Sequence, residues 1–228
     1  MTLMFTAAIL PAVLLGLYIW FKDPQPEPLK WILRAFFAGI IICIPVAFLE
    51  NFISGFLFPS GSPTTLLGTT AEAFLVAALP EESAKLLLLW LFVLRRNPYF
   101  DERFDGIVYA VFVGLGFAAI ENVFYVMGSG DGWVSVAAAR AFLAVPGHYA
   151  FAILMGYYYS KYHFFDHSKT TAVKILLIPV LAHGVYDAIA MSGQVDPIAG
   201  SVSSLVLIWF CIKLQKYAHR KITELAIK

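Results

Sequence analysis

Long apolar stretches alternate with short polar segments along almost the whole chain. Each stretch is long enough, or nearly so, to cross the roughly 30 Å hydrocarbon core of a bilayer as a helix. We therefore predict an all-α fold, a polytopic transmembrane helix bundle in which residues 1–228 form one integral membrane domain. The predicted spans, about seven in number, cover residues 3–21, 31–58, 66–94, 107–127, 135–160, 173–192 and 200–213. Pro80 is expected to kink the third span, because proline removes a helix hydrogen bond and crowds the preceding turn.

Composition strengthens this assignment. Hydrophobic residues make up 60% of the 228 residues and charged residues only 14%, with a mean hydropathy of +0.77, whereas soluble domains are nearer one quarter charged. The net charge of +1 gives no reason to expect nucleic acid as a partner. Cys43 and Cys211 both lie in apolar stretches, so we expect neither a disulfide framework nor a cysteine metal site. The apolar start of the chain is interpreted as a retained first span and not as a signal peptide.

The placement of Lys and Arg predicts the topology. These residues gather in the connections that follow residues 21, 94 and 160 and in the C-terminal tail. The connections after residues 58, 127 and 192, the last of which contains Gln194, carry none. Short connections rich in Lys and Arg stay in the cytoplasm, so the N-terminus is expected outside and the C-terminus in the cytoplasm of a multi-pass protein of the cell membrane.

Ionisable residues inside the predicted spans are the strongest functional signal, because each costs at least about 2.5 kcal/mol at bilayer depth. Glu81 shares a helix face with Lys85 at i,i+4, and Glu82 lies i,i+3 from the same lysine. His183 and Asp187 are also i,i+4, so the carboxylate can orient the imidazole. Other such residues are Glu121, beside Asn122, and His148. Four spans thus place ionisable groups between the midplane and the outer half of the bilayer.

Structural interpretations stand beside the functional one. Glu81 with Lys85 could be a plain ion pair, and Glu72 with Arg140 could join two helices. Glu50 is favoured as structural or interfacial. The convergence of so many costly groups at one depth instead favours a functional site.

These residues could carry out hydrolysis by either of two mechanisms. A glutamate could act as general base towards water while two imidazoles stabilise an oxyanion. Alternatively, His148, His183 and a carboxylate could hold Zn²⁺ and leave one position for water. The chain contains neither a G-x-S-x-G elbow nor an H-E-x-x-H sequence. A proton- or ion-coupled transporter, which also needs midplane carboxylates and histidines, is the alternative from another functional class.

Five short motifs, in a fixed order, carry a resemblance to a known family. They are Pro80-Glu81-Glu82-Ser83-Ala84-Lys85, Phe104-Asp105-Gly106-Ile107-Val108-Tyr109, Gly116-Phe117-Ala118-Ala119-Ile120-Glu121-Asn122, Pro146-Gly147-His148 and His183-Gly184-Val185-Tyr186-Asp187. From about residue 66 to 190 the chain resembles the PrsW family of intramembrane proteases, distant relatives of the type II CAAX prenyl endopeptidases. The CAAX enzymes carry histidine in place of Glu121 and arginine in place of Lys85, which argues against prenylated substrates.

The resemblance implies the roles of the site residues. It implies Glu81, Glu82, Glu121, His148 and His183 as the catalytic set, with Lys85, Asn122 and Asp187 in support. The catalytic core is then about residues 66–192. A divalent metal such as zinc is expected on His148, His183 and Glu121, or else no cofactor at all. The expected activity is that of an endopeptidase, a membrane protease that depends on glutamate and histidine. If zinc is bound, the enzyme is a metallopeptidase. Family members cut a membrane-anchored anti-sigma factor on its extracytoplasmic side, so the expected partners are a single-span membrane protein substrate and the lipid bilayer.

Overall fold

The computed structural model describes residues 1–193, 195 and 197–226, and within them all regular secondary structure is helical. The elements join into seven continuous helical rods, which confirms the predicted all-α class. The rods are α1 (Thr2–Lys22); α2 (Leu29–Leu57); α3 (Leu66–Ala71) with η1 (Glu72–Ala78), α4 (Leu79–Leu88) and η2 (Leu89–Leu94); α5 (Asp105–Gly128); η3 (Gly130–Gly132) with α6 (Trp133–Ala139), η4 (Arg140–Ala144) and α7 (Val145–Phe164); α8 (Lys169–Ser192); and α9 (Pro197–Ala226).

Five helical segments of the described chain are long and apolar enough to cross a membrane: α1, α2, α5, the rod over residues 130–164, and α8. The rod over residues 66–94 falls outside that group, because it carries Glu81, Glu82 and Lys85 together with Glu72. Helix α9 runs from Pro197 to Ala226 and so extends beyond the span predicted over residues 200–213. Its C-terminal half is polar, and hydropathy therefore revealed only its first half. Gln194 lies outside the described residues.

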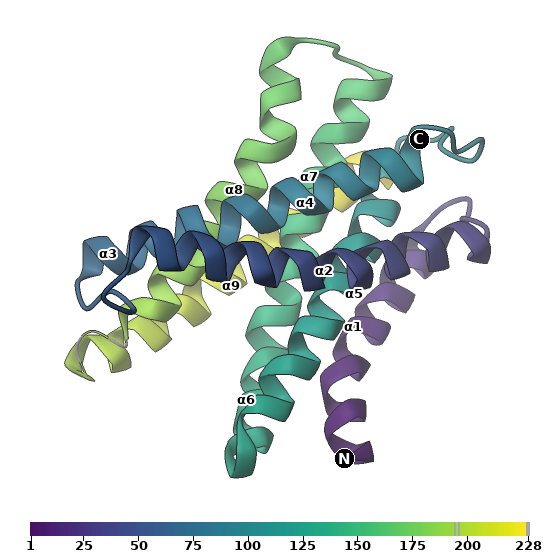
Figure 1. The fold of residues 1–228 in the computed structure, drawn as a ribbon. Helices are drawn as coiled ribbons and strands as arrows, with labels where there is room; N and C mark the ends of the chain where they lie inside the picture. The colour runs from purple at the N-terminus through teal and green to yellow at the C-terminus, as the bar shows by residue number, and fades with distance from the viewer. Residues whose placement is uncertain (194, 196, 227–228) are drawn as a thin grey trace.

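Helix α5 forms the centre of the bundle. Most of its side chains are buried, and it packs against α1, α2 and α7. Figure 1 shows α2 running across α5 at a steep angle. At this crossing a Cβ atom on Gly116 would lie 2.0 Å from the carbonyl oxygen of Phe36, and one on Gly39 would lie 2.0 Å from that of Val113. Only glycine permits such backbone contact, and small residues are common where membrane helices approach closely.

Two π-helical turns precede residues of the predicted site. Segment η1 ends immediately before Leu79-Pro80, and η4 ends immediately before Val145-Pro146. Proline lacks the N–H that would continue the α-helical ladder, and its ring crowds the turn before it. The rod containing Pro80 therefore accommodates the proline with a wider π turn, a feature often found at functional sites.

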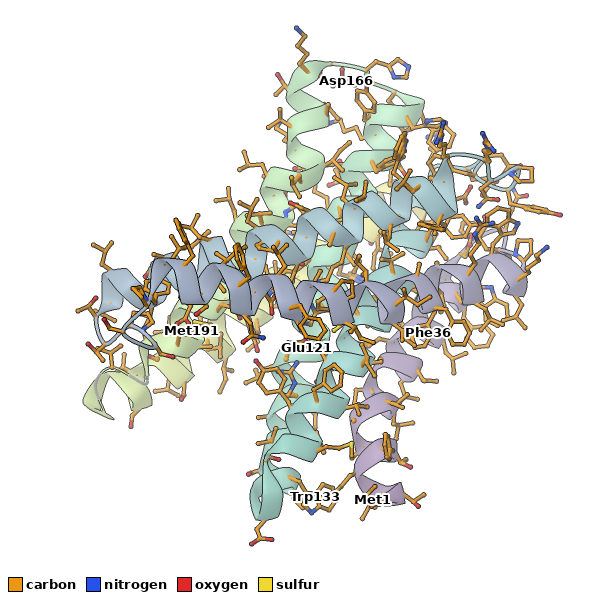
Figure 2. All side chains as sticks on the ribbon, viewed as in Figure 1. Met1, Phe36, Glu121, Trp133, Asp166 and Met191 are labelled. Atoms are coloured by element: carbon orange, nitrogen blue, oxygen red, sulfur yellow. The ribbon has the colours of Figure 1, made fainter. Side chains whose placement is uncertain are left out.

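The ends of the rods separate by their charge. Figure 1 shows the connections after α1, η2 and α7 towards the top and right, and the N-terminus with the connections after α2 and α5 towards the left and bottom. In Figure 2, Asp166 accordingly lies at the top, whereas Met1, Trp133 and Met191 lie at the bottom or left. Lys and Arg lie within the first group of connections or in the helix ends beside them, and the second group has none in or beside it.

Candidate active site

Glu81, Glu82 and Lys85 project from one face of α4, as their spacing predicts. The Nζ atom of Lys85 lies 2.8 Å from Oε2 of Glu81 and 2.8 Å from Oε1 of Glu82. All three side chains are almost fully buried, with at most 5% of any residue exposed. The ammonium group therefore neutralises part of the charge of the glutamate pair and holds both carboxylates in place.

Lys85 also orients His148. Its Nζ lies 3.2 Å from Nδ1 of the imidazole, and an ammonium group can only donate. Nδ1 of His148 must then accept, so Nε2 carries the proton in the neutral ring. That Nε2 lies 2.8 Å from Oε2 of Glu121 and donates to it. Three residues from three rods are joined in this way.

Arg140 completes the environment of Glu121. Its Nη2 lies 2.8 Å from Oε2 of Glu121, and its Nε donates to Oδ1 of Asn122. Asn122 in turn donates to the carbonyl oxygen of Ala8, 3.1 Å away on α1. The interpretation of Arg140 as a partner of Glu72 is therefore wrong, because the rotation of the helices presents Glu121 to it instead.

Carboxylates contact both nitrogens of His183. Nδ1 lies 3.0 Å from Oε1 of Glu82, and Nε2 lies 3.2 Å from Oδ2 of Asp187, one turn along α8. The ring also stacks on Phe151 with centroids 4.7 Å apart. His183 consequently has a fixed orientation, with its centroid 5.3 Å from that of His148.

These groups surround one cavity of ≈ 470 Å³ inside the bundle. Glu81, Glu121, His148, His183 and Asp187 line it, whereas Glu82, Lys85 and Asn122 support the wall from behind. Glu121 lies near the centre of the molecule in Figure 2. The structure thus brings together every site residue that the sequence predicted, five at the cavity and three behind it.

Sequence reasoning missed three charged residues of the wall, Glu50, Glu72 and Arg140. Glu50 approaches Glu81 from α2, and its Oε1 is buried without a hydrogen-bond partner among the described residues. All three residues are ionisable and lie inside predicted spans, and that was the available signal. Their helix rotation, which places them at the cavity, cannot be read from spacing on a single helix.

The cluster offers donor atoms that could hold a metal ion. Glu81, Glu82, His148 and His183 each contribute one ligand atom, and these atoms lie within 4.8 Å of one another. Imidazole nitrogens with carboxylate oxygens are a set that suits zinc, and a carboxylate beside each imidazole, as seen here, is usual for metal-bound histidine. The residues present therefore fit a divalent metal of this type. The predicted set of His148, His183 and Glu121 shares its two imidazoles with this cluster.

Comparison with known proteins identifies relatives along most of the chain. The model of the PrsW family intramembrane metalloproteases matches residues 27–214. Protease PrsW of Geobacillus kaustophilus (strain HTA426) is 34% identical over 215 residues, which cover 93% of this chain and 91% of the relative. Protease PrsW of Clostridioides difficile (strain 630) is 34% identical over 226 residues, covering 95% and 92%, and that of Bacillus subtilis (strain 168) is 35% identical over 187 residues, covering 81% of each.

No solved structure matches the chain. The family match, the relatives and the five apolar spans together identify a multi-pass integral membrane protein. The chain belongs to the PrsW family of intramembrane metalloproteases.

Proposed function

We propose that the protein is an endopeptidase that hydrolyses a peptide bond of a single-span, membrane-anchored protein on the extracytoplasmic side of the membrane. An anti-sigma factor is the proposed substrate class. The observation that carries the proposal is the meeting of Glu81, His148 and His183, from three separate rods, at one cavity inside an apolar bundle. A group of buried charges this costly supports catalysis over packing, and the family match favours proteolysis over transport.

Glu81 is the proposed general base. It lines the cavity, where it can reach a water molecule placed beside the substrate carbonyl. Glu82 is less exposed, at 1%, and its Oε1 contacts both Lys85 and His183. We therefore assign Glu82 the role of positioning Lys85 and His183, so that the two adjacent carboxylates have different functions.

The two imidazoles are the proposed donors to the oxyanion that develops on the attacked carbonyl. His148 has its proton on Nε2, the nitrogen that faces Glu121 at the cavity. Glu121, paired with Arg140, keeps that N–H aligned while no substrate is present. Asp187 plays the same part for His183.

His148 and His183, together with Glu121 or one of the paired glutamates, would hold the metal that the family name implies, and zinc is our proposal for its identity. When bound, zinc supplies a coordinated water whose pKa falls to about 7. The protein's own contribution is the same in either case. It fixes the carboxylates and imidazoles around one point and excludes bulk water with apolar helix faces.

The proposed side of cleavage follows from the shape of the cavity. Its wall extends from the central glutamates towards the rod ends that meet the connections without Lys or Arg. Glu72, Tyr125, Arg140 and Met191 are the wall residues on that side. With those connections outside the cell, the cavity lies in the extracytoplasmic half of the membrane.

Cleavage of a single-span substrate by the purified protein in proteoliposomes tests the proposal. Glu81→Gln and His183→Ala should abolish cleavage while leaving insertion unchanged, since glutamine keeps the shape of the side chain but cannot accept the proton. Glu224→Gln on α9, where the side chain is 47% exposed, is the matched control and should cleave normally. Near-normal cleavage by both Glu81→Gln and Glu82→Gln would refute the assignment. Ion flux without any cleavage would favour the transporter alternative.

A further inference from the structure

A second group of carboxylates lies away from the active site, where α1 ends and α5 begins. Asp23, Glu102 and Asp105 each place one oxygen within 4.8 Å of the others. Glu27 adjoins them, with its carboxylate close to that of Asp105. Asp23, Glu27 and Asp105 are only 5%, 4% and 1% exposed, and Glu102 is half-buried. Four acidic side chains therefore share a nearly closed space.

Two of these carboxylates are held firmly by one oxygen and leave the other oxygen without a partner. Oδ2 of Asp105 accepts from the backbone N–H groups of Asp101 and Glu102, at 2.9 and 2.6 Å. Oδ1 of Asp23 accepts from the N–H of Gln25 at 3.0 Å. Oδ1 of Asp105 and Oδ2 of Asp23 are buried and have no hydrogen-bond partner among the described residues, and the adjacent Glu27 carboxyl can form a hydrogen bond with Asp105 only when one of the two is protonated. Buried acceptors of this kind normally face a donor or a cation.

No positive side chain among the described residues pairs with these four acids. The two neighbouring basic side chains contact aromatic rings instead. Nζ of Lys22 lies 5.8 Å from the ring centre of Tyr18, and the guanidinium of Arg103 lies 4.7 Å from that of Phe165. Burial without a compensating charge raises the pKa of Asp23 to about 6. No basic side chain among the described residues therefore compensates these acids, and burial raises the pKa of Glu27 as well, to about 7.

We propose that Asp23, Glu102 and Asp105, with Glu27 beside them, form a site for a hard divalent cation of the Ca²⁺ or Mg²⁺ type. All the ligand atoms are carboxylate oxygens, which such cations prefer. The site contains no imidazole and so differs in kind from the cluster at His148 and His183. An ion there joins the end of α1, the connection to α2 and the segment before α5, and it stabilises this end of the bundle.

Terbium luminescence on the purified full-length chain in detergent tests the site directly. Tb³⁺ substitutes for Ca²⁺ and is excited through nearby aromatic rings. Such rings are present, because the hydroxyl of Tyr109 donates to Oε2 of Glu27 and the indole N–H of Trp20 donates to the carbonyl oxygen of Glu27 at 3.2 Å. We expect saturable emission that Ca²⁺ or Mg²⁺ displaces, and the better competitor identifies the cation.

Substitutions at the two sites test whether Tb³⁺ binds at this cluster and not at the active site. Glu102→Gln and Asp105→Asn should each weaken Tb³⁺ binding by about tenfold or more, whereas Glu81→Gln and the exposed Asp131→Asn should leave it unchanged. Glu102 is half-buried, so its variant decides the test if Asp105→Asn does not fold. In the unaltered protein Ca²⁺ or Mg²⁺ should also raise the melting temperature, and in Glu102→Gln it should not. Equal binding by Glu102→Gln and the unaltered chain, or loss of binding in Glu81→Gln instead, would overturn the proposal.

Discussion

We expect Asp187 to fix how His183 faces the cavity. The carboxylate lies 3.2 Å from Nε2 of the imidazole, and both residues line the cavity wall. Asp187→Asn keeps the side-chain shape but removes the charge that orients the ring. We expect kcat to fall by about 10–100-fold with little change in KM, because the ring and not the substrate contact is altered. Steady-state cleavage assays measure both constants.

The exposed Asp131→Asn serves as the control and should cleave like the unaltered protein. A change confined to KM in Asp187→Asn would place Asp187 in substrate binding instead. Unchanged kinetics would show that Glu82 alone orients His183 through Nδ1.

The ligand types of the two ion sites predict different responses to chelators. His148 and His183 supply nitrogen donors that suit zinc, whereas the cluster around Asp105 supplies only oxygen. We expect 1,10-phenanthroline to abolish cleavage and added Zn²⁺ to restore it, without loss of Tb³⁺ binding at the second cluster. Metal analysis by mass spectrometry before and after treatment quantifies the zinc. Full cleavage by rigorously zinc-free protein would eliminate the zinc proposal and leave Glu81 as an unaided general base.

At the scale of helices, the crossing of α2 and α5 sets the geometry of the cavity. Cys43 and Ala47 on α2 and Phe117 and Glu121 on α5 line its wall, close to the glycine contact at Gly39. A methyl group at Gly39 would meet the backbone of α5 at 2.0 Å, a contact that no side-chain movement relieves. Gly39→Ala should therefore force the helices apart and destabilise the protein by about 1–3 kcal/mol.

Gly55 provides a matched control on the same helix, since an added Cβ there meets nothing within 4 Å. Gly55→Ala should be neutral or stabilising by up to about 1 kcal/mol, because alanine favours the helix. Unfolding in mixed detergent micelles compares the two. If Gly39→Ala is as stable as Gly55→Ala, the two helices do not make the backbone contact.

Helix positions were accessible from the sequence, whereas helix rotations were not. The rod over residues 66–94 has the bounds predicted for it from hydropathy, although its charged residues keep it from the group of strongly apolar spans. Glu81, His148 and His183 lie at a similar depth in their predicted spans, and this also predicted that they meet. The partner of Arg140 depends on how each helix turns about its axis, and spacing within one helix does not specify that.

The π-helical turns could not be predicted from the sequence either. Both η1 and η4 precede a proline, yet Pro179 lies inside α8 with no π segment. Proline alone therefore does not specify the wider turn, which depends also on what packs against the helix. This matters for the site, because each π turn rotates the residues that follow it, Glu81 in one rod and His148 in another.

For the whole molecule, the separation of charged and uncharged connections predicts how it lies in the membrane. Ser60 and Asp131 are exposed in connections with no Lys or Arg in or beside them, and Tyr99 and His167 are exposed in connections that contain Lys or Arg or are flanked by them. Single cysteines at the first two positions should react with a membrane-impermeant maleimide on intact cells. Cysteines at Tyr99 and His167 should react only after permeabilisation, because short connections rich in Lys and Arg remain in the cytoplasm.

The natural cysteines, Cys43 and Cys211, are buried and should give little background in the unaltered protein, which is the control. The labelling pattern also decides the proposed side of cleavage, because the cavity wall extends towards Glu72 and Met191, near the connections without Lys or Arg. With Ser60→Cys and Asp131→Cys labelled from outside, a substrate must present its scissile bond in the extracytoplasmic half of the membrane. The reverse pattern would place the cavity in the cytoplasmic half and would rule out cleavage on the outer side, even with every residue of the site in its assigned role.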